Sequence, residues 1–538
     1  MWNGYGTKKS KIMQNKFLVR LLFLFLLFDS KKGFSQTDQL VSTTAQRETE
    51  PFIVVNPADS TNLIAAWMRI SFPSGIATKT SHDGGITWGN YSTLPHFSPS
   101  FTCTSADVSI TFNKAGIAFI AYVDYKVTLD SGYVRVATST NGGDMWNPPV
   151  NAIDGLTTPD LPVDRPWIVC DQTTGAYGGR IYLVSKSYFA ATPPHKIWLS
   201  ISTDSANSFS PITQLDNPVT VGTLTNIMAV PTVGADGSFY SVYASWNTSI
   251  DPFPRFVCTK SIDGGSTFTQ STVAYPVSGS PVTDTLYQGS YSITANPANA
   301  TNLIFQATDA RNGDPDVLTV YSTNSGANWS AIPVRVNDDF SSVTGIGQDM
   351  SWGAFAPNGV YGIAWRDRRN GITNDTSDYE IYASISVDGG ITFKPNFCLS
   401  STPTPFINQI RGNDFIGIAL TNGFLFSDWS DNRNNATTKE DIYVRKTSFG
   451  NFTSVTKITE DKNVYEIFPN PANDLIYISI KEKKSGEILI SDISGKILLT
   501  KKLGTQSNSV SLSKFAPGSY IYYLKIDGIN YSGKLIKE

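Results

Sequence analysis

Hydrophobic and polar residues alternate along most of the chain. Runs such as DVSITFN (107–113) and IAFIAYV (117–123) are rich in β-branched and aromatic residues, and turns containing Gly, Asn and Asp separate them. An alternation with a period of two is typical of strands that bury one face, and the turn residues are those that end strands. The pattern therefore predicts an all-β protein.

The strands form a unit that recurs along the chain. Each unit has a first strand, a short turn, a second strand, a variable loop and a third strand. It ends in a polar eight-residue string such as SHDGGITW (81–88). The strings are spaced 58 to 64 residues apart and begin at Ser81, Ser139, Ser202, Ser261, Ser322 and Ser386. A period near sixty residues fits one four-stranded blade of a β-propeller.

A seventh unit is predicted at the end of the series. There the stretch DIYVRKTSFGNF (441–452) resembles EIYASISVDGGITF (380–393) with a shortened turn. We therefore expect a propeller over residues 36–460 with seven blades, and six blades are the alternative. The sequence leaves open whether a strand from the N-terminus completes the last blade.

The recurring string has a structural explanation. Its Asp or Asn can accept hydrogen bonds from the following N–H groups, its Gly permits positive φ, and its final Trp or Phe can pack between sheets. One active site would not need six copies, so we assign the string to the architecture. The residues with this role are Ser81, Asp83, Gly85, Trp88, Asn141, Trp146, Asp204, Phe209, Asp263, Phe268, Asn324, Trp329, Asp388 and Phe393.

These strings resemble the Asp-box, or BNR repeat, with the pattern Ser-x-Asp-x-Gly-x-Thr-Trp. The resemblance extends from Phe52 to about Phe452 and is specific for the propellers of the sialidase-like superfamily. It is weak for activity, because related folds include sialidases, other glycoside hydrolases and non-catalytic binding proteins.

A separate C-terminal domain is predicted over residues 463–538. Its period-2 strands and its turns indicate a small Ig-like β-sandwich. The segment resembles the C-terminal sorting domain of the type IX secretion system of Bacteroidetes. The resemblance rests on Phe468-Pro469-Asn470-Pro471, Asp492, Gly495-Lys496, Pro517-Gly518 and Lys534. It implies passage through the outer membrane by the type IX machinery, often with removal of this domain. The protein is then secreted or attached to the cell surface.

The N-terminus and the composition agree with export. Lysines precede the apolar run at residues 17–28, and small residues precede a cleavage position before Gln36, so residues 1–35 are predicted to be a signal peptide. The run is shorter than the roughly 20 residues of a membrane span, and no later segment qualifies as a transmembrane anchor. A net charge of −3 gives no global field for nucleic acid. We expect a monomer.

Metal and cofactor chemistry receive no support from the sequence. The four cysteines lie far apart, which excludes a CxxC metal site, and they leave disulfide pairing open. With three histidines, a His-rich zinc site and a Ser-His-Asp triad are both disfavoured. No nucleotide-binding motif occurs. We therefore expect no metal and no cofactor.

Candidate binding residues follow the second strands of units five to seven. The strings are on the same face as the turns between first and second strands, so the other loops emerge on the opposite face, which holds the active site in sialidases. We call this the loop face. Arg311, Arg369 and Arg433 occupy equivalent positions there, with Trp365 and Trp429 beside two of them. Arginines could grip an acidic sugar, but each has acids of its own blade nearby, and we favour that pairing.

Catalytic carboxylates are harder to choose. Sialidases carry a Phe/Tyr-Arg-Ile-Pro motif before the first blade, and no Arg-Ile-Pro occurs in this chain. A general glycosidase needs two carboxylates about 5 to 9.5 Å apart. Weak candidates at the starts of first strands are Asp164, Asp349 and Asp414, with Glu50 at the first blade.

Three functions remain open from the sequence. The favoured one is a cell-surface propeller that binds extracellular glycans or glycoproteins without turnover. The first alternative is an exo-acting, sialidase-like glycoside hydrolase, and the second is a purely structural surface protein. The sequence does not identify the ligand.

Overall fold

The computed structural model forms two compact units, residues 1–452 and 453–538, and each is described by itself. The predicted signal peptide lies outside the described residues. The residues that the structure describes are 37–42, 44, 46–70, 72–99, 102–155, 163–188, 195–217, 228–245, 255–273, 291–309, 312, 314–339, 347–371, 377–405, 415–434, 439–449, 464–481, 484–492, 497–505, 507–526 and 529–538.

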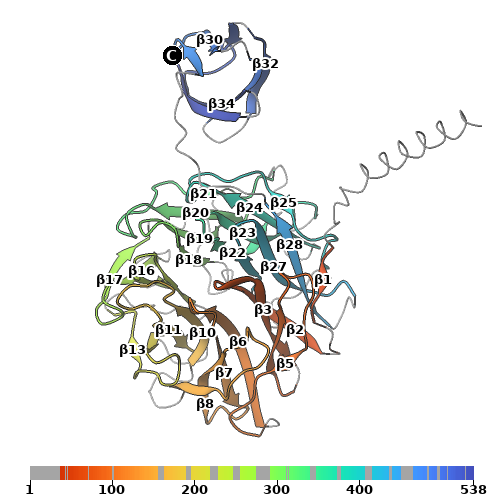
Figure 1. Ribbon diagram of the computed structural model, residues 1–538, viewed down its shortest axis with the longest axis vertical. Helices are drawn as coiled ribbons and strands as arrows, with labels where there is room; N and C mark the ends of the chain where they lie inside the picture. Colours follow the sequence, from red (N-terminus) through yellow and green to blue (C-terminus); the bar gives the residue numbers. More distant parts are fainter. Residues whose placement is uncertain are drawn as a thin grey trace, which may run out of the picture. The chain divides into compact units, whose positions relative to one another are not determined.

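The first unit contains seven four-stranded antiparallel sheets among its described residues, which confirms the predicted propeller (Figure 1). Six sheets use strands that are consecutive in sequence. Blade 1 has β2 (Arg47–Asn56), β3 (Asp59–Ile70), β4 (Gly75–Ser81) and β5 (Ser92–Thr93); blade 2 has β6 (Cys103–Phe112), β7 (Ala118–Lys126), β8 (Gly132–Ser139) and β9 (Val150–Asp154); blade 3 has β10 (Val163–Cys170), β11 (Ile181–Ser187), β12 (Ile197–Ser202) and β13 (Thr213–Gln214). Blade 4 has β14 (Ala229–Val233), β15 (Phe239–Ser245), β16 (Arg255–Ser261) and β17 (Thr269–Thr272); blade 5 has β18 (Tyr291–Ala295), β19 (Leu303–Asp309), β20 (Asp316–Ser322) and β21 (Val334–Arg335); blade 6 has β22 (Gln348–Phe355), β23 (Tyr361–Asp367), β24 (Glu380–Ser386) and β25 (Phe397–Cys398).

Blade 7 closes the ring with a strand from the N-terminus. It consists of β26 (Gly417–Leu420), β27 (Phe424–Asp431), β28 (Asp441–Ser448) and β1 (Gln39–Leu40), in which β1 pairs antiparallel with β28. Asp38, just before β1, accepts hydrogen bonds from Arg433 Nη1 at 2.7 Å and from Ser401 N at 2.8 Å. The N-terminal segment therefore supplies both the outer strand and a buried anion to the last blade.

The first strands of the blades surround the centre of the propeller. Each contacts the first strand of the next blade, and β26 of blade 7 returns to β2 of blade 1. Hydroxyl groups link these neighbouring strands. Ser109 on β6 accepts from Ile168 N and donates to Pro166 O on β10, and Thr232 on β14 accepts from Ala295 N on β18. Because the hydroxyls satisfy backbone groups that face another blade, they set the register of the ring.

The Asp-box turns are stabilised from within. In the turn of blade 4, Asp263 accepts hydrogen bonds from Ser261 Oγ, Thr267 Oγ1 and the backbone N–H groups of Ser266 and Thr267, at 2.5 to 3.0 Å. Gly265 in the same turn has a φ of +89°. These contacts are those predicted for the Asp and Gly of the string.

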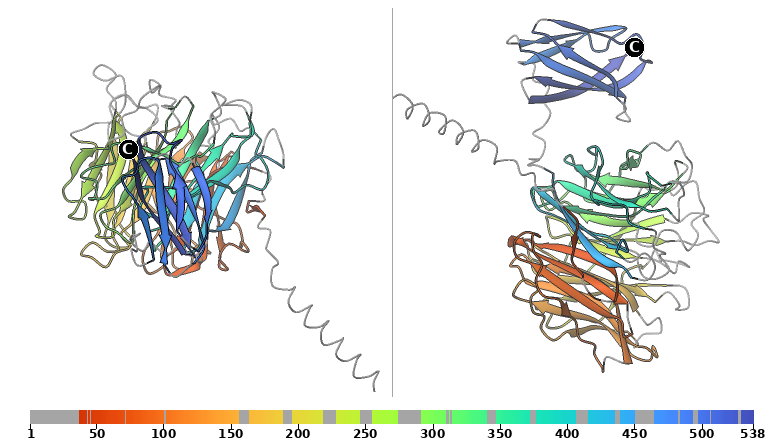
Figure 2. Two further views of the ribbon diagram at one scale, coloured as in Figure 1. Left: turned by 90° about the horizontal axis from the view of Figure 1, so that it is seen from above. Right: turned by 90° about the vertical axis from the view of Figure 1, so that its right-hand side faces the viewer.

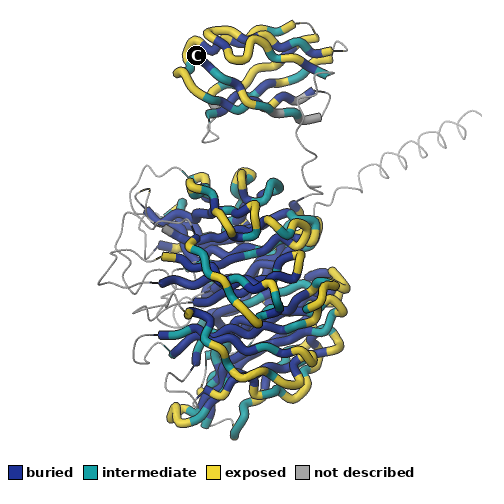
Figure 3. The backbone as a smooth tube through the Cα atoms, turned by 90° about the vertical axis from the view of Figure 1, so that its left-hand side faces the viewer, coloured by how far each residue is buried: buried dark blue, intermediate teal, exposed yellow. Residues whose placement is uncertain are grey.

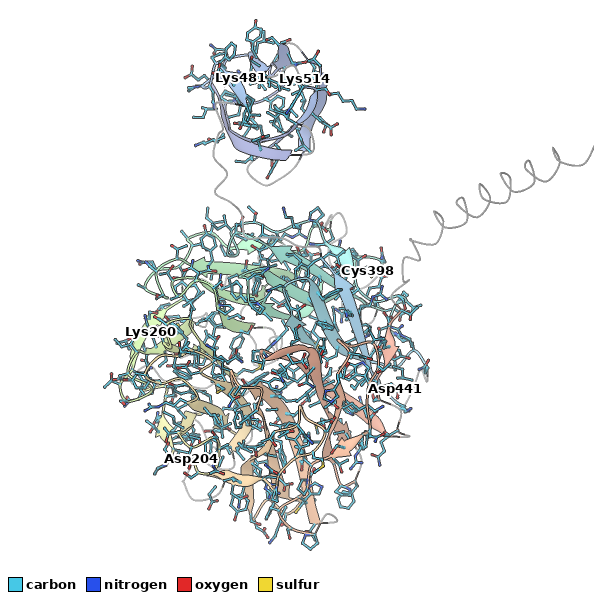
Figure 4. The ribbon with its side chains drawn as sticks, viewed as in Figure 1. Asp204, Lys260, Cys398, Asp441, Lys481 and Lys514 are labelled. Atoms are coloured by element: carbon cyan, nitrogen blue, oxygen red, sulfur yellow. The ribbon has the colours of Figure 1, made fainter. Side chains whose placement is uncertain are left out.

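The same turns also connect neighbouring blades. A side chain of the preceding blade donates to a backbone carbonyl of the box in blades 1, 2, 4, 5 and 6, as in the contacts of Lys446 with Gly84, Asn62 with Gly142, Arg180 with Gly264, Lys260 with Ser325 and Asn302 with Gly389. Figure 4 places Asp204 and Lys260 toward the outer edge of the propeller, away from its centre. The repeated string therefore stabilises turns and contacts between blades at the periphery.

In the first unit the strands are largely buried and many turns are exposed, whereas in the second unit buried and exposed residues alternate along the strands (Figure 3). The side view in Figure 2 shows the propeller strands running between two faces, with turns at the ends of the strands. Cys103, Cys170 and Cys258 are buried, Cys398 is exposed, and all four are free thiols.

The second unit is a sandwich of two sheets. One sheet contains β29 (Tyr465–Phe468), β30 (Leu475–Ile480) and β33 (Asn508–Ser511). The other contains β32 (Ile497–Leu503), β31 (Gly486–Asp492), β34 (Gly518–Ile526) and β35 (Ile529–Lys537). Ile476, Ile488 and Leu524 lie in the core between them. Asn470 of the predicted signature donates to Lys534 O and accepts from Ile536 N, so it holds the last strand in place.

Candidate functional site

The predicted arginine of blade 6 is held within its own region of the propeller. Asp367, at the end of β23, accepts from Arg369 Nη2 at 2.8 Å, from Arg369 N at 2.8 Å and from Trp365 Nε1 at 2.7 Å. Arg369 also pairs with Asp338 at 2.9 Å and lies over the ring of Tyr382. Trp365 is fully buried. Protein acceptors thus hold both terminal nitrogens of the guanidinium.

Blade 7 repeats this arrangement. Asp431, at the end of β27, accepts from Arg433 Nε at 2.8 Å and from Trp429 Nε1 at 3.0 Å, and Arg433 also pairs with Asp38. Trp429 is 1% exposed. Arg311 lies outside the described residues. The two described arginines have the same-blade pairing that the sequence favoured.

The centre of the propeller is filled by aromatic side chains from four blades. Trp167 of β10 stacks on Trp352 of β22 with ring centroids 5.1 Å apart, and Phe415 meets the edge of Trp167 at 5.5 Å. Phe52 of β2 contacts Trp167 at 5.7 Å. Both tryptophans are buried, so these rings form a plug between the first strands.

At the loop-face end of this plug, four first strands break their regular pairing. Bulges occur in β2, β6, β10 and β22, each within the first part of the strand. A residue in each bulge has a left-handed backbone: Glu50 (φ 53°), Asp107 (φ 49°), Arg165 (φ 48°) and Met350 (φ 49°). We call the residues at these bulges, with Asp164, Lys186 and Asp349, the channel mouth.

Bulges and left-handed residues other than Gly cost energy and concentrate at functional sites. The four bulges also explain why β6 begins at Cys103, before the predicted start at Asp107. The extra residue interrupts the two-residue alternation on which the prediction depended.

A pair of carboxyl groups lies at the channel mouth between blades 2 and 3. Asp107 of β6 and Asp164 of β10 are in side-chain hydrogen-bond contact, and Asp107 Oδ2 also accepts from Arg165 N at 3.3 Å. Burial and the charge of Asp164 raise the pKa of Asp107 to about 8. Burial opposes ionisation of Asp164 as well, but Lys186 and Arg165 hold its pKa below the usual value. The pair therefore keeps one proton at neutral pH.

Basic and phenolic groups surround this pair. Lys186 Nζ of β11 donates to Asp164 Oδ2 at 2.9 Å, and Arg165 lies 5.0 Å above the ring of Phe415 in the plug. Burial raises the pKa of Tyr125, and the charges of Asp164 and Asp107 raise it further. The mouth thus contains a proton-sharing pair of acids, a lysine and an arginine over an apolar floor.

A second charged group lies on blade 6. Asp349 makes a bidentate pair with Arg366, with both distances at 2.6 Å, and it accepts from Arg368 Nη2 at 3.1 Å. Burial opposes ionisation of Asp349, but the two arginines lower its pKa to about 2. Both guanidinium groups lie over the ring of Tyr379. Of the predicted carboxylates, Asp164 and Asp349 thus lie at the channel mouth, and Asp414 is outside the described residues.

One histidine has serine and aspartate neighbours without forming a catalytic relay. His96 Nδ1 lies 2.7 Å from Asp124 and 3.0 Å from Ser105, so the same ring nitrogen faces both residues. In a Ser-His-Asp triad, opposite ring nitrogens contact the two residues. Across the part of the chain that the structure describes, no three His, Cys, Asp or Glu side chains are grouped as ligands for a metal ion.

Sequence reasoning missed Asp107 and Lys186. Asp107 was placed in a first strand without a role, and Lys186 lies inside a second strand. A weak signal existed, because several first strands are preceded by charged residues, as in RETEP (47–51) and VDRPW (163–167). Only the bulges in the structure show that these charged residues lie at the same height along the first strands.

Comparison with protein families bears on the second unit. Residues 466–538 match the family described as the secretion system C-terminal sorting domain. This segment is similar to type IX sorting domains. The chain is accordingly exported to the cell surface or beyond, as its C-terminal signature predicted. No helix in the described part is long and apolar enough to cross a membrane.

For the whole chain, no curated protein sequence matches. Among solved structures, a Hadza microbial sialidase is 12% identical, with 75% of this chain and 66% of that chain covered and a TM-score of 0.40. A protein of unknown function from Dyadobacter fermentans is 13% identical over 76% and 97% of the two chains, with a TM-score of 0.41. An α-L-arabinofuranosidase from Fusarium graminearum is 14% identical over 78% and 98%, with a TM-score of 0.41. We take no activity from these likenesses.

Proposed function

We propose that this exported propeller binds an extracellular glycan at the channel mouth. The observation that carries the proposal is the set of four bulges at one level of the ring, which brings Asp107, Asp164 and Arg165 together over the aromatic plug.

The chemistry of the mouth suits sugars. Carboxylates accept hydrogen bonds from hydroxyl groups, and the plug below them supplies an apolar base that excludes water. The structural arginines Arg369 and Arg433 do not contribute, because carboxylates of the protein already occupy them. A binding site on this face is compatible with the peripheral, structural role of the Asp-box turns.

The test is a glycan array probed with the chain lacking residues 1–35. The expected result is binding to a defined glycan set that weakens about tenfold or more for Asp164→Asn, because hydrogen bonds to charged groups contribute about 1.5–3 kcal/mol. Asp388→Asn in the Asp-box of blade 6 is the matched control and should bind as wild type. Binding that is unaffected by Asp164→Asn would place the ligand elsewhere.

Glycoside hydrolysis is the second candidate, and one observation favours it. The raised pKa of Asp107 provides a protonated carboxyl at neutral pH, as a general acid requires. However, Asp107 and Asp164 are in contact, whereas the two carboxylates of a glycosidase are about 5 to 9.5 Å apart. Sugar release that Asp107→Asn abolishes while binding persists would establish an enzyme; no release from any bound glycan would leave a binding protein.

A further inference from the structure

The ion pairs of Asp164 and Asp349 at the channel mouth are each arranged in two layers, and the half-buried Arg165 over Phe415 stands outside them. In the ion pair between β10 and β11 of blade 3, the side chain of Asp164 is 14% exposed, whereas that of Lys186 is 1% exposed. The carboxylate therefore reaches solvent, and the lysine lies beneath it. An incoming ligand meets the negative member of the pair first.

The same order holds on blade 6. The side chain of Asp349 is 11% exposed, while Arg366 and Arg368, which pair with it, are 2% and 5% exposed. Both arginines lie over the ring of Tyr379, which keeps them at a fixed depth. The ion pairs on blades 3 and 6 occupy the same register position of the first two strands, and in both the aspartate is less buried than the cations that pair with it.

This layering selects among ligands. A ligand carboxylate, sulfate or phosphate would approach the exposed oxygens of Asp164 and Asp349, and it could reach Lys186, Arg366 or Arg368 only by displacing them. Breaking a buried ion pair leaves an uncompensated charge, which is costly. A sugar hydroxyl instead donates to the exposed oxygens and leaves both groups intact.

We infer that the channel mouth is selective for glycans without acidic groups and rejects sialylated, sulfated or phosphorylated ones. The inference rests on the proposed function and adds the class of ligand. It is the opposite of what an arginine clamp for an acidic sugar would require, because the carboxylate partners of the described arginines occupy the places that an acidic sugar would need.

Matched ligands make the test direct. Binding of the chain lacking residues 1–35 is measured by biolayer interferometry against one sialylated glycoprotein, before and after enzymatic removal of its sialic acid. The expected result is an affinity ~tenfold or more higher for the desialylated form, because like charges juxtaposed in an interface are strongly unfavourable. Asp164→Asn should narrow the difference in affinity between the desialylated and the sialylated form. Asp107→Asn replaces it as the test variant if Asp164→Asn does not fold. Asp236→Asn, on the turn between β14 and β15 at the opposite face, should leave the difference unchanged.

The outcomes separate the two proposals. Equal or tighter binding of the sialylated form overturns the selectivity but retains a glycan-binding mouth. Binding of neither form, together with no binding on a broad array, overturns the proposed function itself. A preference for the desialylated form that Asp164→Asn reduces and Asp236→Asn does not supports both.

Discussion

The Asp-box turns and the channel mouth both contain aspartates, and they place these side chains in opposite environments. Asp263 is in an exposed turn, where the hydroxyl and N–H of Thr267 and the hydroxyl of Ser261 donate to it and lower its pKa. Asp107 is in a bulge at the centre of the ring, where burial and Asp164 raise its pKa. Hydrogen bonds to the ionised form dominate in the first case, and desolvation with a like charge dominates in the second.

The difference separates architecture from function. The box aspartate recurs on blade after blade with similar local partners, and its contacts hold turns and neighbouring blades. Asp107, by contrast, lies at a bulge where its backbone is left-handed and its surroundings oppose ionisation. A carboxyl group whose ionised form the fold stabilises can be structural, whereas a carboxyl group whose ionised form the fold destabilises marks a candidate site.

The largest effect is expected at Asp349. Asp349→Ala leaves Arg366 and Arg368 buried without their shared carboxylate, and removal of one partner from a buried ion pair costs about 3–5 kcal/mol. The free energy of unfolding, measured by denaturant titration, should fall by this amount. A loss below about 1 kcal/mol would mean that solvent reaches the two guanidinium groups, and it would break the distinction drawn for the mouth.

The next largest loss of stability is expected at a glycine of the Asp-box. Gly265 has a φ of +89°, and a Cβ at this position would lie 2.4 Å from Ile201 Cδ1 of the preceding blade. Gly265→Ala should therefore lower the free energy of unfolding by about 1–3 kcal/mol through backbone strain and overpacking. Gly179→Ala is the matched control, because Gly179 also has positive φ but no atom within 4 Å of its added Cβ. A smaller loss in the control isolates the contact between blades.

A moderate effect is expected at the box aspartate itself. Asp263→Ala removes one acceptor shared by two hydroxyls and two N–H groups in an exposed turn, where water can replace part of the interaction. The free energy of unfolding should fall by less than it does for Gly265→Ala, with glycan binding unchanged. Loss of binding in a folded Asp263→Ala protein would show that the boxes take part in function.

The fold was predictable to a large extent because it is repeated. Six copies of one string and the degenerate copy at 441–452 indicated seven blades, and short-range alternation located the strands. The closing strand at Gln39–Leu40 was not predictable, since two residues carry no periodic signal and their partner Tyr443–Val444 is about 400 residues away in sequence. The bulges were also hidden, because one extra residue looks like the end of a strand.

The site was less predictable for a related reason. The equivalent arginines attracted attention because they repeat, and their repetition reflects a structural unit of Trp, Asp and Arg, as in Trp365, Asp367 and Arg369. Lys186 pairs with Asp164 as Arg366 pairs with Asp349, at the same register position of the first two strands, and no sequence string marks that position. Asp107 becomes a neighbour of Asp164 only through contact between blades. Local patterns find what a fold repeats, and single sites need tertiary structure.

The most specific effect is a pH dependence at Asp107. Its pKa is raised from 3.8 to about 8, so between these values the folded protein holds a proton that the unfolded chain has released. Stability from this group is therefore fully present below about pH 4 and declines as the pH rises toward about 8. Asp107→Asn cannot titrate, so its free energy of unfolding should fall less over this range than that of wild type.

The measurement is the difference in stability between wild type and Asp107→Asn at several pH values from about 4 to about 8, because a difference cancels titrations common to both proteins. Asp428, whose pKa burial also raises, is common to both and drops out. The depressed pKa of Asp164 has the opposite sign, but its contribution is complete above about pH 4 and does not alter the slope. A difference that stays constant across the range would mean that Asp107 is ionised in the folded protein, and the mouth aspartates would then resemble those of the boxes.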